Sequence, residues 1–285
     1  MKGKMMKFSR RTFFAAALGS AAACSAGPLS APAFAAEKSA SGGVLFDLGI
    51  ASYSFRQFDA DTLLKWAKKA QIKYVSVKDM HLPINSTDDE CRAFAKKFAA
   101  AGVTVYSCGV IYMENESQVD NAFRYATALG AVSIVGVPEH ALLPYVEQKV
   151  KETGILMAIH NHGPGDKRFP TAASVWEKVN KMDPRMGIAL DIGHSVRIGE
   201  DPVEAVRQYA SRIFDFHFKD MNKAAPEGSG VICGTGVIDL PGLVRALIDV
   251  KYDRVAPFEY EIDGDDPFPG FMQSLGYVRG LCRMS

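Results

Sequence analysis

Short β-rich runs alternate with amphipathic helical patterns eight times along this sequence. The predicted strands cover residues 48–54, 74–78, 104–110, 132–137, 156–160, 187–191, 213–217 and 254–260. Predicted helices cover residues 61–70, 119–129, 142–153, 172–181, 202–211, 241–250 and 272–281, and another begins after residues 86–89 and ends at Gly102. Strands that alternate with helices form parallel sheets. Eight repeats predict an α/β fold, a single (β/α)8 TIM barrel over residues 44–285.

An open dinucleotide-binding sheet is the main competing α/β architecture, and it needs a glycine-rich turn after its first strand. In this sequence the corresponding turn, residues 54–57, contains no glycine. The closed barrel is therefore favoured over a dinucleotide-binding fold.

The first 36 residues have the composition of a signal peptide. Lysines and arginines precede a small apolar run, and the first acidic residue is Glu37. Residues 9–14, Ser-Arg-Arg-Thr-Phe-Phe, resemble the signal recognised by the twin-arginine (Tat) export machinery. Residues 33–35, Ala-Phe-Ala, match a small-x-small cleavage site. We therefore expect export to the periplasm.

A second interpretation of the same segment is a lipoprotein signal. Residues 21–23 are alanines ahead of Cys24, which is a weak form of the lipid-attachment motif. On that interpretation the exported chain would be lipid-anchored through Cys24. Residues 37–43 are expected to be a linker between the signal and the barrel.

Charge and cysteine content argue against two classes of function. The chain contains 33 lysines and arginines against 32 acidic residues, so no overall field favours a polyanion, and nucleic acid is not expected as a partner. Five cysteines are scattered without a CxxC pair, so neither a zinc knuckle nor a thioredoxin-type site is indicated.

All six histidines lie at or just beyond the end of a predicted strand, and none lies in a predicted helix. They are His81, His140, His160, His162, His194 and His217. In a TIM barrel the carboxyl ends of the strands meet at one rim, where the functional residues gather. The distribution therefore predicts a site rich in imidazole at that rim.

Side-chain alternation indicates which polar residues face the barrel axis. On the seventh strand aromatic residues alternate with polar ones. The aromatic set is predicted to pack under the helices, and the polar set is predicted to face inward. The aromatic set is Phe214, Phe216 and Phe218, and the polar set is Asp215, His217 and Lys219. Buried polar residues are costly unless they are paired or bind a ligand.

Four residues from consecutive strands are predicted to hold one divalent metal ion: His160, Asp191, His217 and Glu259. Two imidazoles with two carboxylates form a mixed site suited to Mn²⁺, Co²⁺, Zn²⁺ or Mg²⁺. The alternative is a buried hydrogen-bonded cluster without metal.

Four segments resemble the xylose isomerase-like TIM barrel superfamily, which includes sugar phosphate isomerases and epimerases, inosose dehydratase and relatives of endonuclease IV. They are residues 189–194 (ALDIGH), 215–220 (DFHFKD), 234–239 (GTGVID) and 258–261 (FEYE). The resemblance covers essentially the whole mature chain, and it implies a sugar substrate.

By that resemblance, Asp191, His217 and Glu259 match the metal ligands of the sixth, seventh and eighth strands. The fifth-strand ligand is usually a glutamate, whereas this chain has His160. In sugar epimerases the two glutamates also act as the acid and base, so this difference puts a two-base epimerisation in doubt. Residues 160–166 resemble exported members of the superfamily that process 3-keto-glycosides.

The resulting hypothesis is a sugar isomerase, epimerase or lyase that acts next to a carbonyl through an enediolate intermediate. Glu259, His162 and His194 are the candidate bases, and His194 is favoured as an acid/base that contacts the substrate. Lys219 is expected to be a fixed positive charge, with a salt bridge to Asp220 or Asp215 as its alternative role.

Four further rim residues are predicted to bind substrate: Lys78, His81, Arg197 and Glu261. Two other functions stay open: a non-catalytic sugar-binding barrel and, less favoured, a phosphodiesterase like endonuclease IV. The sequence does not fix the oligomeric state, and a homo-oligomer is compatible with it.

Overall fold

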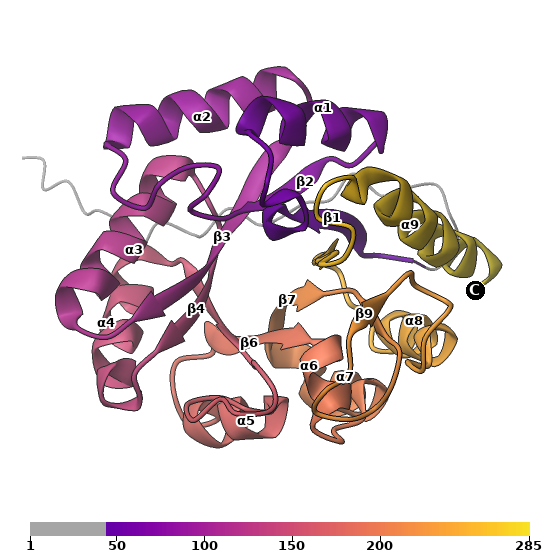
Figure 1. Ribbon diagram of the computed structural model, residues 1–285. Helices are drawn as coiled ribbons and strands as arrows, with labels where there is room; N and C mark the ends of the chain where they lie inside the picture. Colours follow the sequence, from indigo (N-terminus) through magenta and orange to yellow (C-terminus); the bar gives the residue numbers. More distant parts are fainter. Residues whose placement is uncertain (1–43) are drawn as a thin grey trace, which may run out of the picture.

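Eight parallel strands form one sheet in the order β10-β1-β2-β3-β4-β5-β6-β7 (Figure 1). The computed structural model describes residues 44–285, so the predictions for residues 1–36 and 37–43 lie outside the described residues. The strands are β1 (Asp47–Ala51), β2 (Tyr74–Val77), β3 (Thr104–Met113), β4 (Ser133–Pro138), β5 (Leu156–His160), β6 (Met186–Asp191), β7 (Ile213–His217) and β10 (Val255–Phe258).

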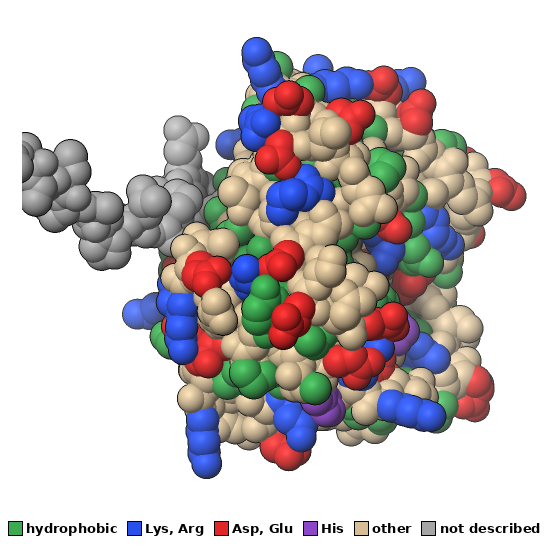
Figure 2. Space-filling model, turned by 90° about the vertical axis from the view of Figure 1, so that its left-hand side faces the viewer, with side chains coloured by type: hydrophobic (Ala, Val, Ile, Leu, Met, Phe, Trp, Pro, Cys, Tyr) green, Lys and Arg blue, Asp and Glu red, His purple; other side chains and the backbone are tan. Residues whose placement is uncertain are grey.

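Helices surround this sheet as an outer layer (Figure 1). They are α1 (Ala60–Lys69), α2 (Asp88–Ala100), α3 (Glu116–Leu129), α4 (Leu143–Thr153), α5 (Ala172–Val179), α6 (Ile192–Arg197), α7 (Pro202–Tyr209), α8 (Leu240–Asp249) and α9 (Pro267–Met284), with the short 3-10 helices η1 (Ser52–Phe55), η2 (His140–Leu142) and η3 (Ala210–Arg212). Within residues 44–285 no helix combines the length and apolarity needed to span a membrane. Figure 2 shows basic and acidic side chains interspersed over one face of the molecule.

The sheet closes between its first and last members by an isolated parallel bridge from Phe218 to Phe258. The Phe218 amide donates to the Pro257 carbonyl at 2.8 Å, and the Glu259 amide donates to the Phe218 carbonyl at 3.0 Å. The predicted (β/α)8 TIM barrel is therefore confirmed, with each predicted strand present.

The predicted first strand ends three residues early, at Ala51, because η1 follows it. The Ser54 hydroxyl donates to the Phe258 carbonyl at 3.1 Å and accepts from the Tyr260 amide at 2.9 Å. The Ser52 hydroxyl accepts from the Lys78 amide at 2.8 Å. Serine side chains thus continue the contacts to both neighbouring strands after the backbone has turned.

Two elements near the carboxyl rim were not predicted. Helix α6 follows β6 directly, and a two-stranded antiparallel hairpin, β8 (Asp220–Met221) with β9 (Gly230–Val231), follows β7. Two histidines therefore lie in short helices that were not predicted, His194 in α6 and His140 in η2. Both helices are too short to produce a recognisable 3.6-residue periodicity.

The prediction that Phe214 packs under the helices is also wrong. Its ring belongs to a small cluster with Val135, Ala158 and Ala189, three residues of neighbouring barrel strands. A register shift between β6 and β7 at residues 188–189 changes the alternation at this point of β7. A side chain on Gly187 would come within 2.5 Å of the Phe214 ring, so this glycine leaves room for it.

Asp215 is a fully buried carboxyl that the Tyr106 hydroxyl contacts at 3.0 Å and 3.1 Å. Its carboxylate also accepts from the Phe216 amide at 2.8 Å. Burial raises the pKa of Asp215 to about 6, although the charge of His217 opposes this effect. The folded protein therefore retains a proton on Asp215 at a pH where the unfolded chain has lost it.

This difference predicts how stability depends on pH. The unfolded carboxyl titrates near pH 4, so the contribution of Asp215 to the free energy of unfolding falls by up to about 3 kcal/mol as pH rises from 4 to 7. In Asp215→Asn that fall should be absent, so the stability of the variant relative to wild type should increase over this range. Urea unfolding of the metal-free proteins measures it.

Asp61→Asn is the matched control, because the side chain of Asp61 is 71% exposed. Its stability relative to wild type should change by less than 1 kcal/mol over the same pH range. A pH-independent difference between Asp215→Asn and wild type would contradict the assignment.

Candidate active site at the carboxyl rim

The structure brings together the four residues predicted as metal ligands. His160, Asp191 and His217 are the last residues of β5, β6 and β7, and Glu259 directly follows β10. Each of these four side chains is less than 10% exposed. Since these parallel strands end at the same rim, their last side chains converge there.

The amide of Asn161 fixes the position of Asp191. Its oxygen accepts from the Asp191 backbone N–H at 2.9 Å, and its nitrogen donates to the Asp191 carbonyl at 3.1 Å. The Asp191 carboxylate in turn accepts from the His194 backbone N–H at 2.8 Å and caps α6. Asn161 was not predicted as a site residue, although its place between His160 and His162 at the end of a strand was a usable signal.

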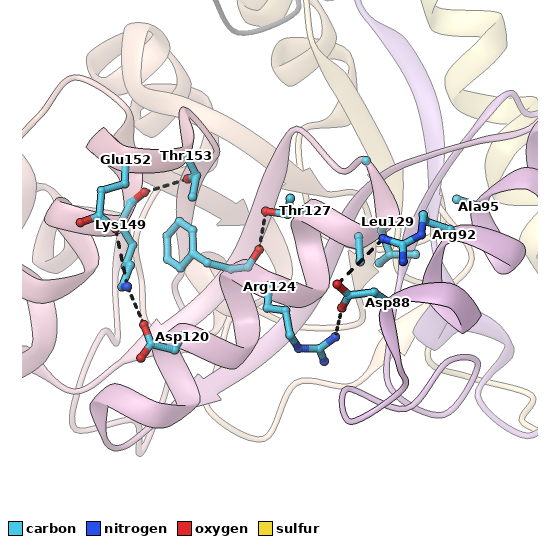
Figure 3. A pocket seen from close by; sticks show the side chains of 13 residues that line it. Asp88, Arg92, Ala95, Asp120, Arg124, Thr127, Leu129, Lys149, Glu152 and Thr153 are labelled. Atoms are coloured by element: carbon cyan, nitrogen blue, oxygen red, sulfur yellow. Dashed lines mark hydrogen bonds and ion pairs between the residues drawn. The ribbon is translucent and has the colours of Figure 1, made fainter. Parts of the chain in front are cut away.

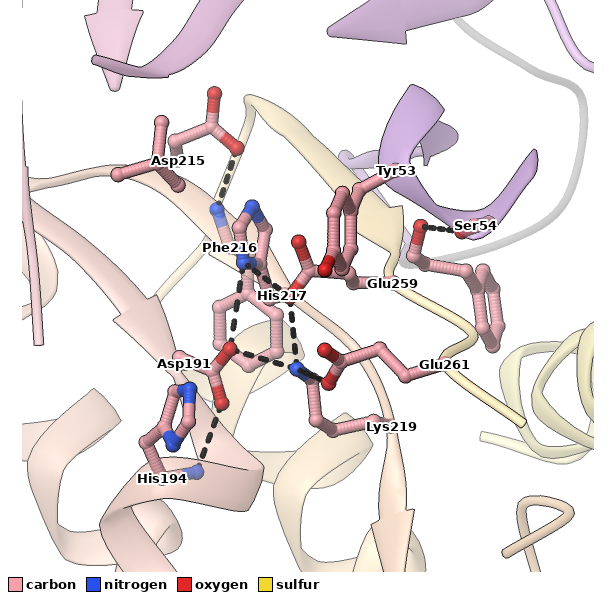
Figure 4. A network of polar contacts seen from close by, with 12 residues as sticks. Tyr53, Ser54, Asp191, His194, Asp215, Phe216, His217, Lys219, Glu259 and Glu261 are labelled. Atoms are coloured by element: carbon pink, nitrogen blue, oxygen red, sulfur yellow. Dashed lines mark hydrogen bonds and ion pairs between the residues drawn. The ribbon is translucent and has the colours of Figure 1, made fainter. Parts of the chain in front are cut away.

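Lys219 forms salt bridges with the site carboxylates. The alternative prediction was a salt bridge to Asp215 or Asp220. The Lys219 ammonium nitrogen is 2.9 Å from Asp191 Oδ2, 2.7 Å from Glu259 Oε2 and 2.7 Å from Glu261 Oε2. Figure 4 shows the side chains of Lys219, Glu259 and Asp191 joined in one polar network. The expected fixed positive charge is therefore held at the rim by three carboxylates.

This network strongly shifts the pKa values of its members. Burial alone would lower the pKa of His217, but the charge of Glu259 and the contact with Asp191 raise it to about 10. Burial alone would raise the pKa values of Asp191 and Glu259, yet Lys219 and the neighbouring histidines hold both well below their ordinary range. Both carboxylates are thus charged at neutral pH.

His160 differs from the rest of the network because one of its ring nitrogens has no hydrogen-bond partner among the described residues. Its Nδ1 atom is buried and has no hydrogen bond within residues 44–285. Burial and the charge of His217 lower its pKa well below the ordinary value, so its imidazole is neutral. Buried polar atoms are normally paired, and a neutral imidazole with an available nitrogen is a good metal ligand.

The donor atoms of His160, Asp191 and His217 lie within 4.8 Å of one another, and Glu259 Oε2 is 3.1 Å from His217 Nδ1. Two nitrogen donors and carboxylate oxygens are the ligand set of Zn²⁺ and Mn²⁺ sites. The residues present therefore fit a divalent metal ion.

His160, His162 and His194 form a second group whose donor atoms also lie within 4.8 Å. Arg197 Nη1 is 3.2 Å from His194 Nδ1. Because a guanidinium can only donate, Nδ1 must be the acceptor, and the neutral ring then carries its proton on Nε2. Burial lowers the pKa of His194, which favours this neutral form.

The structure places Arg197 beside His194, and its predicted role in substrate binding stays a prediction. Its guanidinium also donates to the Pro226 carbonyl at 2.6 Å and 3.0 Å, which holds it against the loop after β8. Arg197 thus positions His194.

The other predicted binding residues lie in different surroundings. Lys78 donates to the Val110 carbonyl at 3.3 Å, and Glu261 is partly exposed and bound to Lys219. His81 is buried. Burial lowers the pKa of its imidazole, and the charge of Asp59 opposes this shift. Within the described residues no contact joins His81 to the four candidate ligands. Its predicted role in binding stays a prediction.

The motif of residues 234–239 has a structural role. The buried carboxylate of Asp220 accepts hydrogen bonds from the backbone of Met221, Gly234, Gly236 and Ile238 at 2.8–3.1 Å. A side chain on Gly236 would lie 2.3 Å from Asp220 Oδ1, so only glycine allows this approach. This loop follows β9 and is fixed to β8 by the one carboxylate of Asp220.

A cavity of about 530 Å³ lies on the outer flank of the barrel, between α2, α3 and α4 (Figure 3). Its charged residues pair with one another: Arg124 with Asp88 at 2.6 Å, and Lys149 with Asp120 at 2.7 Å. None of the candidate site residues lines this cavity.

Fold and site together define a (β/α)8 barrel with imidazoles and carboxylates clustered at its carboxyl rim. The chain belongs to the xylose isomerase-like TIM barrel family, whose family model matches residues 45–281. The resemblance inferred from the four segments is therefore confirmed.

Among curated proteins, inosose dehydratase of Lacticaseibacillus casei is 26% identical over an alignment of 143 residues, and the match covers 40% of this chain and 47% of that protein. The 3-oxo-isoapionate decarboxylase of Pectobacterium atrosepticum is 39% identical over 70 residues, 22% of this chain and 26% of that protein. The matches thus span about half the length of these relatives or less.

Solved structures share the fold. The IOLI protein with a bound zinc atom superposes with a TM-score of 0.70 at 17% identity, over 82% of this chain and 98% of that one. L-ribulose 3-epimerase gives a TM-score of 0.67 at 16% identity, over 84% and 95% of the two chains. At these identities the likeness supports the fold alone.

Proposed function

We propose that this protein is a divalent-metal-dependent enzyme that removes the proton next to the carbonyl of a keto-sugar and expels a substituent from the adjacent carbon. The substrate class includes 3-keto-glycosides. The observation that carries the proposal is the buried group of His160, Asp191 and His217 beside Glu259, in which His160 Nδ1 has no hydrogen-bond partner within residues 44–285. The relatives named above as a dehydratase and a decarboxylase support chemistry on oxidised sugars.

A divalent ion held by His160, Asp191, His217 and Glu259 would supply a Lewis acid that polarises the carbonyl and stabilises negative charge on its oxygen. Lys219 adds a fixed positive charge at the same rim, since Asp191, Glu259 and Glu261 hold its ammonium group in place. A preorganised charge of this kind stabilises a developing oxyanion without rearrangement.

His162 and His194 are suited to opposite proton-transfer roles. His194 carries its proton on Nε2, because Arg197 donates to Nδ1, so it is suited to donate a proton. Nδ1 of His162 lies 3.6 Å from Asp166 Oδ2, and this carboxylate favours a proton on Nδ1. Nε2 of His162 is then the acceptor, which is the form of a general base.

These roles favour elimination over epimerisation. His162 accepts the proton as the C–H bond breaks, and the electron pair moves toward the carbonyl oxygen to give an enolate. As the C=O bond re-forms, the pair makes a double bond to the next carbon, the C–O bond of that carbon breaks, and His194 protonates the departing oxygen. Epimerisation requires a second base on the opposite face of the carbon. In sugar epimerases this base is the glutamate of the fifth strand, where this chain has His160, which we assign to the metal.

Metal content tests the ligand set. Wild type should bind about one divalent ion per chain, and His217→Ala and His160→Gln should lose it, because each removes a ligand. Elemental mass spectrometry on the purified proteins measures the content. His140→Gln is the matched control, since His140 lies in η2 and binds the Arg168 carbonyl instead. A wild type that stays metal-free after reconstitution would favour a sugar-binding barrel over an enzyme.

Deuterium exchange separates the base from the acid. In D₂O, His162→Gln should exchange the hydrogen next to the carbonyl of a 3-keto-glycoside at least about 100-fold more slowly than wild type. His194→Gln should retain exchange but release the leaving group about 100-fold more slowly. Mass spectrometry follows both events, and metal content checks that each site is intact. The reverse pattern would exchange the two assignments.

We also propose that residues 1–36 direct export to the periplasm through the Tat machinery. The support is the twin-arginine motif of residues 9–14 and the cleavage motif of residues 33–35. A fusion of residues 1–40 to a reporter should reach the periplasm, and Arg10→Lys with Arg11→Lys should abolish this. Export that survives both changes would exclude the Tat route. Lipid labelling that is lost in Cys24→Ala would show the anchored form.

A further inference from the structure

A second cavity, of about 280 Å³, lies where β2 and β3 end, at the same rim as the candidate active site. Its lining combines apolar side chains, two tyrosines and one charge of each sign. The lining residues that carry the argument are Lys78, Asp79, Val110, Ile111, Tyr112 and Tyr125. None of the candidate ligands lines this cavity.

On one side the cavity is connected to the site through Lys78. The Lys78 ammonium lies 5.3 Å from the centre of the Tyr53 ring, and the Arg56 guanidinium lies 5.0 Å from the same centre. Arg56 also donates to the Glu261 carbonyl at 2.9 Å, and the Glu261 carboxylate binds Lys219. Tyr53 appears with Lys219 and Glu261 in the network of Figure 4.

On the other side the cavity borders the loop that carries His162. The Arg168 guanidinium of this loop lies 5.7 Å from the centre of the Tyr112 ring. Asp166 holds the loop in shape, because its Oδ1 accepts from the backbone N–H groups of Arg168 and Phe169 at 2.7 Å. The cavity is therefore joined to active-site elements on two sides.

Size and chemistry select the ligand. Pockets for small molecules usually measure about 300–1,000 Å³, so this cavity has room for one ring but not for a polymer. Tyr112 is the exposed aromatic side chain of the lining, at 45% exposure. Lys78 and Asp79 supply a donor and acceptors beside apolar walls. This combination fits a six-membered ring with an apolar face and polar substituents at its edge.

We propose that this cavity binds the second ring of a glycoside, the ring that leaves, while the oxidised sugar ring lies at the metal-binding residues. The inference rests on the proposed function and makes it more specific: the substrate is a glycoside with a ring as its leaving group rather than a free ketose. The ring is another sugar or an aromatic alcohol, since both present an apolar face and an oxygen at the edge.

Binding of unoxidised glycosides tests the cavity without any reaction, because these compounds contain no ketone. The probes are methyl β-glucoside, phenyl β-glucoside and methyl β-cellobioside, titrated into the purified full chain and followed by calorimetry. We expect at least one two-ring probe to bind about tenfold more tightly than methyl β-glucoside. The tighter of the two identifies the leaving ring as aromatic or as sugar.

Two variants locate the preference. Tyr112→Ala removes the exposed aromatic face, and Ile111→Trp fills the cavity. In each variant the affinity for the preferred two-ring probe, divided by the affinity for methyl β-glucoside, should fall to about one. Tyr145→Ala is the matched control, because the Tyr145 ring also has a cation near it, Lys149 at 5.1 Å, but lies outside this cavity. The control should keep the ratio of wild type.

Equal affinities for all three probes in wild type would overturn the proposal, and so would a preference that persists in both cavity variants. The ratio of kcat/KM for the 3-keto forms of the phenyl and methyl glucosides should follow the same order. A ring preference that depends on Tyr112, without turnover of either 3-keto form, would support the cavity assignment and refute the proposed function.

Discussion

The ammonium group of Lys219 is the interaction on which the carboxyl rim depends. It joins carboxylates from the end of β6 and from the segment after β10, while Lys219 itself follows β7. At this point the barrel is closed by the isolated bridge between Phe218 and Phe258. Charges buried at such a joint are costly unless all are paired. Pairing therefore stabilises the closure and positions the site with the same contacts.

The surrounding contacts show why the site is rigid. Asn161 binds both backbone groups of Asp191. The Asp220 carboxylate accepts from three backbone N–H groups of the loop after β9 and from the N–H of its neighbour Met221. Ser54 links η1 to the segment after β10. In each case a short polar side chain binds backbone groups at the point where the hydrogen bonds between neighbouring strands end. The functional groups at the strand ends and just after them therefore lie on ordered backbone.

The barrel and the convergence of the four candidate ligands could be predicted because both follow from periodicity and from the ends of parallel strands. Helix α6 could not, since six residues are too few to show a helical pattern. The inward position of Phe214 depends on a register shift between β6 and β7, which the alternation of residues does not reveal. The tautomer of His194 depends on Arg197, and the cavity beside Tyr112 depends on packing. Neither is encoded locally.

His160 in place of a glutamate changes the charge of the proposed site. With His217 as a neutral metal ligand, Asp191, Glu259 and Glu261 would carry three negative charges beside the single positive charge of Lys219. A divalent ion bound with neutral imidazoles would then leave the site without net charge, whereas a glutamate at position 160 would leave it negative. A neutral site opposes a developing anion less than a negative one does. Under the proposed function, the histidine would give up a second carboxylate base but favour an anionic intermediate, which is the requirement of a one-base elimination.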